Sequence, residues 1–192
     1  MTTQIGRMGA KDPDLAAAAT SELAAIAPGR VRVLSLMVED HPGVLERVAS
    51  QVRRRGFNIQ SLTVGPVAAG RSRMTVTVDA GHAEVDQVAK QVDKLVEVIE
   101  VTDITDHPII SRELIVARVT VPRPAREAFA AKVAGYGGQV IDATGENLVV
   151  ELSAAPERVE GFLALLQPYG LAELARSGPV AMLRSTNGSA SR

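Results

Sequence analysis

The residues best suited to bind a small molecule lie in a loop between a predicted strand and a predicted helix. Glu39-Asp40-His41 follows an apolar strand over 31–38, and Pro42-Gly43 then opens the helix. A helix start presents unpaired N–H groups and the positive end of the dipole, so it can hold a carboxylate. Gly43 has no side chain, which lets a ligand approach the backbone. The alternative is structural, with Pro42-Gly43 starting the helix and Asp40 capping it, and the loop by itself favours that simpler explanation.

A helix and a second strand must position this loop. Apolar residues recur from Val44 to Val52 on one helical face, and Gly56 stands where a left-handed residue commonly ends a helix. The next strand changes its alternation, because Phe57 and Ile59 have one parity and Leu62 and Val64 the other. We therefore predict a β-bulge near Gln60–Ser61, a feature often found beside binding sites.

Composition and motifs argue against several other functions. The 192 residues carry a formal net charge of −1, which disfavours a nucleic-acid binder, and they include no cysteine. No apolar run is long enough to cross a bilayer, and no signal peptide is recognisable. The histidines at 41, 82 and 107 fall in separate expected loops without the spacing of metal ligands. We expect a cytoplasmic protein that binds no membrane, nucleic acid or metal.

The order of predicted elements repeats along the chain. Strands over 74–78 and 98–104 around a helix over 85–95 complete a first βαββαβ unit. A second unit has strands over 113–121, 139–143, 148–152 and 180–183 and helices over 124–135 and 156–166. The predicted fold class is α+β, with two ferredoxin-like domains whose antiparallel sheets carry helices on one face. We predict a mobile N-terminal extension, a first domain, a linker, a second domain and a disordered tail, at residues 1–30, 31–106, 107–112, 113–184 and 185–192.

Several runs of residues resemble one known family. In the first unit they are Glu39-Asp40-His41-Pro42-Gly43-Val44-Leu45 and the more specific Arg54-Arg55-Gly56-Phe57-Asn58-Ile59-Gln60-Ser61-Leu62. In the second unit they include Pro168-Tyr169-Gly170-Leu171 and Arg176-Ser177-Gly178. On these residues the chain resembles the regulatory small subunit of acetolactate synthase, whose N-terminal domain is an amino-acid-sensing ACT domain and whose C-terminal domain is ACT-like.

The resemblance implies a regulatory subunit with no catalytic site and no cofactor of its own. Its implied partner is the large catalytic subunit, which uses thiamine diphosphate, magnesium and FAD. The small subunit raises the activity of that partner and confers feedback inhibition by valine in branched-chain amino acid biosynthesis. The resemblance also implies a homodimer joined through the ACT domains, with the effector between the loop of one subunit and the second strand of the other.

The same resemblance assigns site residues. The backbone N–H groups of Gly43 and Val44 would hold the carboxylate of the effector, and the side chains of Val44 and Leu45 would lie near its apolar branch. Asp40, Asn58 and the backbone of Ile59 would meet its polar groups. Asp40 stands where the family often has Asn.

Two other functions remain open on the same topology. One is an ACT-domain, amino-acid-sensing gene regulator, although no helix-turn-helix segment is visible in the sequence. The other is a small hydrolase of the acylphosphatase type, although its first loop would lack a phosphate-binding arginine. Co-purification with a large thiamine-dependent partner would separate the regulatory subunit from both.

Overall fold

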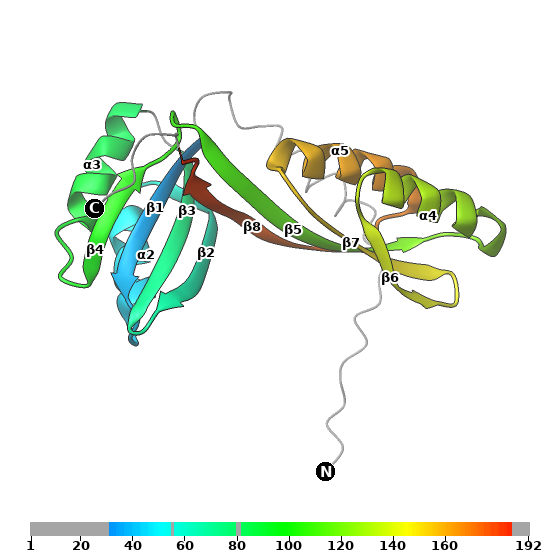
Figure 1. Cartoon of the computed structure of the whole chain (residues 1–192), viewed down its shortest axis with the longest axis horizontal. Coiled ribbons are helices and arrows are strands. Elements are labelled where there is room, and N and C mark those ends of the chain that lie inside the picture. Colours follow the sequence, from blue (N-terminus) through cyan, green and yellow to red (C-terminus); the bar gives the residue numbers. More distant parts are fainter. Residues whose placement is uncertain (1–30, 55, 80–81, 186–192) are drawn as a thin grey trace, which may run out of the picture.

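The structure, a computed structural model, describes residues 31–54, 56–79 and 82–185. It contains two four-stranded antiparallel sheets, each with α-helices on one face (Figure 1). This arrangement confirms the predicted α+β class with two βαββαβ units. The expected N-terminal extension lies outside the described residues, as does the expected tail beyond Ser185.

The first sheet has the strand order β2-β3-β1-β4. Its strands are β1 (Val31–Glu39), β2 (Asn58–Ala68), β3 (Arg71–Asp79) and β4 (Val98–Asp103), and its helices are α2 (Val44–Arg54) and α3 (His82–Val92). Alternate residues of β1, namely Leu34, Leu36 and Val38, are buried in the same core as Val48 and Val52 of α2. Period-two burial on the strand and period-four burial on the helix thus join the two elements.

The second sheet has the order β6-β7-β5-β8. Its strands are β5 (Ile109–Thr120), β6 (Gln139–Thr144), β7 (Asn147–Ala154) and β8 (Glu173–Leu183). The helices are α4 (Arg126–Gly135) and α5 (Pro156–Leu166), and the short 3₁₀ segments are η1 (Arg123–Ala125) and η2 (Gln167–Tyr169). Phe129 and Phe162 are fully buried in its core, which packs separately from the first.

Two strands of the second sheet are longer than the sequence predicts. β5 begins at Ile109, so most of the expected linker over 107–112 is strand, and β8 begins at Glu173 rather than at 180. Gly178-Pro179 suggests the end of an element, but the structure accommodates it as an irregularity inside β8. The β5–β8 register shifts between Glu113 and Ile115, which is the signature of a bulge.

The extended pair of β5 and β8 reaches from the second sheet to the first domain (Figure 1). Near its end, the backbone N–H of Ala181 donates to Oγ1 of Thr75 at 3.4 Å, and both residues are buried. Thr75 alternates with Met74 and Val76, which face the helices, so it belongs to the opposite, helix-free face of the first sheet. The end of β8 therefore covers part of that face.

A buried arginine ties the two ends of the first domain together. The Arg32 guanidinium lies 2.8 Å from the Asp103 carboxylate and 2.9 Å from that of Asp106. Burial acts to raise the pKa of Asp103, but hydrogen bonds from the hydroxyl and N–H of Thr105 and from Arg32, together with the Arg32 charge, hold that pKa below its ordinary value of 3.8. The ionised carboxylate of Asp103 therefore stabilises the folded state at pH values above 3.8.

We expect Asp103→Asn to lower the free energy of unfolding by about 2 kcal/mol near pH 7, because it removes the more buried of the two carboxylates facing Arg32. The contribution of Asp103 is lost as pH falls below 3.8 and through the lower pKa of the folded state. Urea unfolding near pH 7 and in acid should therefore show the difference between wild type and variant shrinking. Glu173→Gln, which breaks the exposed pair with Arg118, is the control and should change little. A difference that is the same at both pH values would contradict this role.

Candidate functional site

The loop after β1 is shaped by two backbone features. The N–H of Asp40 donates to the carbonyl of Gly70 at 3.0 Å, which ties the loop to the turn between β2 and β3. Gly43 has φ +94°, and its carbonyl accepts the N–H of Arg47 at 3.1 Å. Gly43 is thus the last residue before α2, whereas the sequence predicts that Pro42-Gly43 opens the helix. The difference has a physical cause, because this left-handed φ is readily adopted only by glycine.

The loop retains the features that suit an anion. By helix geometry the first N–H groups of α2 have no partner within the helix, and these belong to Val44 and the residues that follow. A Cβ placed on Gly43 would meet no atom within 4 Å, so the space in front of this backbone is open. Beside it lies a shallow hollow of about 460 Å³, lined by Glu39, Asp40, His41, Ala69, Gly70, Arg71 and Ile99.

Val44 and Leu45, both expected near an apolar branch of the effector, differ in exposure. The side chain of Val44 is 3% exposed and belongs to the core of the first domain, so only its backbone N–H suits a ligand. Leu45 is 45% exposed and offers an apolar side chain at the surface. The side-chain role expected for Val44 therefore does not fit this structure, whereas the role expected for Leu45 does.

Asn58 and Ile59 lie at the other end of the sheet. Asn58 pairs with Asp79 at the end of β3, whereas Glu39, next to the loop, pairs with Arg71 at its start. Eight residues of strand separate these two positions, which corresponds to about 26 Å. One chain therefore does not bring Asn58 and the loop together.

The predicted bulge in β2 is confirmed. The β2–β3 register shifts between Ile59 and Ser61, so Gln60 is the extra residue. The shift places Ser61 and Thr63 opposite Thr77 and Thr75, on the helix-free face of the first sheet. The bulge thus turns two small hydroxyl side chains of an edge strand toward the second domain.

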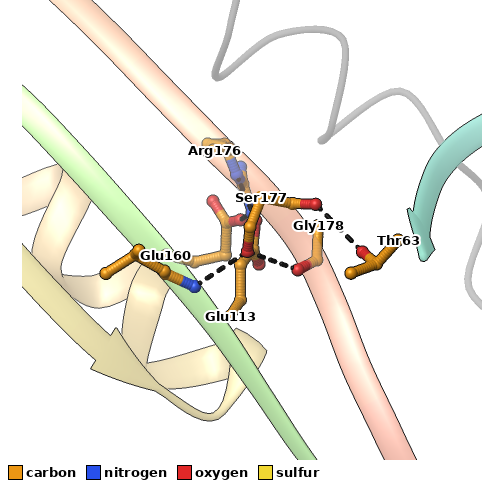
Figure 2. A network of polar contacts seen from close by, with 7 residues as sticks. Thr63, Glu113, Glu160, Arg176, Ser177 and Gly178 are labelled. Atoms are coloured by element: carbon orange, nitrogen blue, oxygen red, sulfur yellow. Dashed lines mark hydrogen bonds and ion pairs between the residues drawn. The ribbon is translucent and has the colours of Figure 1, made fainter. Parts of the chain in front are cut away.

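Ser61 and Thr63 contact a second bulge, in β8, which the sequence pattern does not predict. Figure 2 shows Thr63 beside Ser177 and Gly178 of β8; its Oγ1 donates to the carbonyl of Ser177 at 3.1 Å. A Cβ built on Gly178, which has φ +71°, would lie 2.5 Å from Cβ of Ser61. The contact between the domains therefore requires glycine at this position. The available signal was Gly178-Pro179 itself, which is out of place in an ordinary strand.

A network of ion pairs lies beside the bulge in β8, and Figure 2 labels its members Arg176, Glu113 and Glu160. Arg176 donates to both carboxylate oxygens of Glu113, at 2.6 and 2.9 Å, and also to Glu160 at 2.9 Å. Burial acts to lower the pKa of Arg176, but the hydrogen bonds and charges of Glu113 and Glu160 raise it above its ordinary value. Glu113 is only 4% exposed, so this pairing compensates a buried charge.

Metal binding and insertion into a membrane are two further possibilities that can be checked against the described residues. His41 lies 3.2 Å from the carboxylate of Glu39 in the exposed loop. Among the described residues, no group of three or more His, Cys, Asp or Glu side chains could hold a metal ion. No helix within the same ranges is long and apolar enough to span a bilayer.

Two family models match the chain, one for each domain. The AHAS small subunit-like ACT domain matches residues 34–100. The model described as the small subunit of acetolactate synthase matches residues 112–185. Each match thus spans most of one βαββαβ unit, in the order of the chain.

Curated relatives and a solved structure agree with these matches. The chain is 40% identical over 156 residues to the acetolactate synthase small subunit of Mycolicibacterium smegmatis, covering 81% of this chain and 92% of the relative. It is 35% identical over 162 residues to that of Bacillus subtilis, covering 83% and 94%. The crystal structure of the Thermotoga maritima small subunit aligns with a TM-score of 0.74 at 36% identity, covering 82% of this chain and 99% of that chain.

Proposed function

The chain belongs to the family of acetolactate synthase small subunits, and from this premise we propose that it binds the large catalytic subunit, raises its activity and makes it sensitive to valine. The observation that carries the proposal is that the first domain matches the small-subunit-like ACT domain model and the second domain matches the other small-subunit model. The catalytic chemistry then resides in the large subunit with its thiamine diphosphate, magnesium and FAD. The gene-regulator and hydrolase alternatives are set aside, because each would leave the match of the second domain unexplained.

We propose further that two copies build the effector site. β2 is an edge strand of the first sheet, so its outer backbone groups are free to pair with another strand. If β2 pairs with β2 of a second copy around a two-fold axis, the strands run antiparallel. The start of one β2, with Asn58, then approaches the end of the partner sheet that carries the loop. The loop of one copy and Asn58 of the other would then lie close together, although the two are far apart within one chain.

The chemistry of the two halves suits a small amino acid. The N–H groups at the start of α2 would hold the carboxylate, with the open space before Gly43 allowing close approach. Asp40 and Asn58 are both exposed and could accept hydrogen bonds from the ammonium group. Leu45, also exposed, would contact the apolar branch. Valine is the effector that the family assignment favours.

Regulation then follows from linkage between two sites. An effector that binds one conformation of the complex more tightly shifts the complex toward that conformation. The contact of Ser61 and Thr63 with Gly178 and Ser177 joins the effector-binding strand to the second domain. A change at β2 therefore reaches β8 through direct contact.

Co-purification tests the proposed partnership. A tagged copy of this chain, produced together with the large subunit from the same organism, should retain that subunit through affinity and size-exclusion steps. The tag expressed alone is the control for capture by the resin. A large subunit that elutes separately from the chain at micromolar concentrations of both would count against the partnership.

A further inference from the structure

A second cavity lies between the two domains, apart from the loop after β1. It has a volume of about 240 Å³ and lies between the helix-free face of the first sheet and the end of β8. Its lining includes Met37, Arg73, Glu100, Ile104, Met182 and Leu183. Small-molecule sites occur preferentially at domain interfaces, so the chemistry of this lining is informative.

Strand pairing places two residues of opposite charge, Arg73 and Glu100, on either side of the apolar residue Met37. Met37 of β1 pairs with Arg73 of β3 on one side and with Glu100 of β4 on the other. The three residues therefore form one row across the helix-free face, with the outer two separated by two strand spacings, or about 10 Å. A neighbouring row adds hydroxyl groups from Ser35 and Thr102.

The cation of this row is not neutralised within the described ranges. Arg73 forms no ion pair there, and its Nε is buried without a hydrogen-bond acceptor. Glu100 accepts one weak hydrogen bond, from Oγ1 of Thr102 at 3.3 Å. A guanidinium that lines a cavity and has no acidic partner can hold a ligand carboxylate through charge-assisted hydrogen bonds.

Apolar side chains from both domains complete the lining. Ile104, from the first domain, is 1% exposed, whereas Met182 and Leu183, from β8, are 51% and 49% exposed. The two β8 residues thus have apolar surface that a molecule in the cavity would cover. A cation, an anion and apolar walls in one small space are together complementary to a zwitterion with an apolar branch.

We propose that this cavity binds a small α-amino acid with an apolar side chain, its carboxylate on Arg73, its ammonium group toward Glu100 and its branch against Met37, Met182 and Leu183. The ligand would contact both domains at once. This site differs from the proposed effector site, because it lies on the helix-free face and needs only one chain. Its test uses the full chain without the large subunit, so its failure would leave the proposed function untouched.

The methionines supply local reporters. Of the five in the chain, Met37 and Met182 line the cavity, whereas Met74 is buried on the helix-covered side of the sheet. In full-length protein labelled with methyl-¹³C methionine, L-valine is the first probe, and Met→Leu variants assign the signals. We expect saturable shifts of the Met37 and Met182 methyl signals and a smaller change at Met74. The same shifts should occur in Gly43→Asp, which alters only the other site.

Substitutions of Arg73 and Glu100 test which charged group of the ligand each residue contacts. Arg73→Gln should weaken binding about tenfold or more, because hydrogen bonds to charged groups are the stronger ones, and Arg73→Lys should recover part of the loss. Glu100→Gln should weaken L-valine binding and leave the binding of 3-methylbutanoate, which lacks the ammonium group, unchanged. 2-Methylpropylamine, which lacks the carboxylate, should not respond to Arg73→Gln.

The inference is overturned if L-valine produces no saturable shift at Met37 or Met182 in wild-type protein. It is also overturned if the shifts occur with the same affinity in Arg73→Gln, since binding would then not use the guanidinium. An affinity for 3-methylbutanoate equal to that for L-valine would overturn the assignment to an amino acid.

Discussion

Gly43→Asp is expected to weaken the response to valine more than tenfold while activation of the large subunit persists. The substitution places a carboxylate in the open space before Gly43, where the effector carboxylate would bind. Two like charges about 4 Å apart repel by roughly 4 kcal/mol at an intermediate dielectric, an upper figure for an exposed loop. Half of that energy weakens effector binding by more than tenfold. Titration of L-valine against the reconstituted enzyme measures the loss.

Gly43→Ala is the matched control. Because Gly43 has φ +94°, any other residue there strains the backbone, by about 1–3 kcal/mol. Alanine introduces that strain without the charge and fits the open space. We expect Gly43→Ala to keep most of the valine response. An equal loss in both variants would attribute the effect to the backbone, and an unchanged response in Gly43→Asp would place the effector elsewhere.

Mixed dimers test whether the site is shared between two chains. Asn58→Ala should weaken the valine response more mildly, because it removes one hydrogen-bonding side chain. A dimer of one Gly43→Asp chain and one Asn58→Ala chain has one site with both changes and one with neither. Mixing the two variants should therefore restore part of the response missing from Gly43→Asp alone. No recovery after subunit exchange would contradict a composite site.

Gly178→Ala is expected to separate the two domains. The added Cβ would lie 2.5 Å from Cβ of Ser61 and 2.9 Å from its Oγ, so the contact between β2 and β8 must open. Overpacking of this kind costs about 1–3 kcal/mol, and the φ of +71° adds backbone strain. Limited proteolysis should release the two domains faster, and thermal unfolding should begin at a lower temperature.

Two controls separate the clash from the strain. Gly170 has a similar φ of +63° but open space around it, so Gly170→Ala introduces strain without a clash between the domains. Ser61→Gly removes the opposing side chain, and the double variant with Gly178→Ala should regain part of the lost stability. Equal effects of Gly178→Ala and Gly170→Ala, with no recovery in the double variant, would show that the contact contributes nothing.

Local patterns predicted the elements whose signals lie within a few residues. The helix over 156–166 has the bounds of α5, because Pro156 suits a first helical position and Val159, Phe162, Leu163 and Leu166 form one stripe. The parity change around Gln60 located the bulge in β2. In both cases the information is the spacing of neighbouring side chains.

The features that the sequence did not reveal depend on distant contacts. Gly178-Pro179 is typical of the end of a strand, and only its pairing with β5 keeps it inside β8. The left-handed φ of Gly43 moved the start of α2, and the burial of Val44 depends on the packed core. The resemblance, and no local pattern, assigned Asn58 and the loop to different subunits, and the strand register keeps the two apart within one chain.

We propose that this chain regulates acetolactate synthase through its large subunit. The most direct measurement is the rate of acetolactate formation by the purified large subunit as this chain is added, with and without L-valine. We predict a rate that rises to a plateau, and inhibition by L-valine that depends on the presence of this chain. A rate that stays unchanged at saturating amounts of the chain would contradict it.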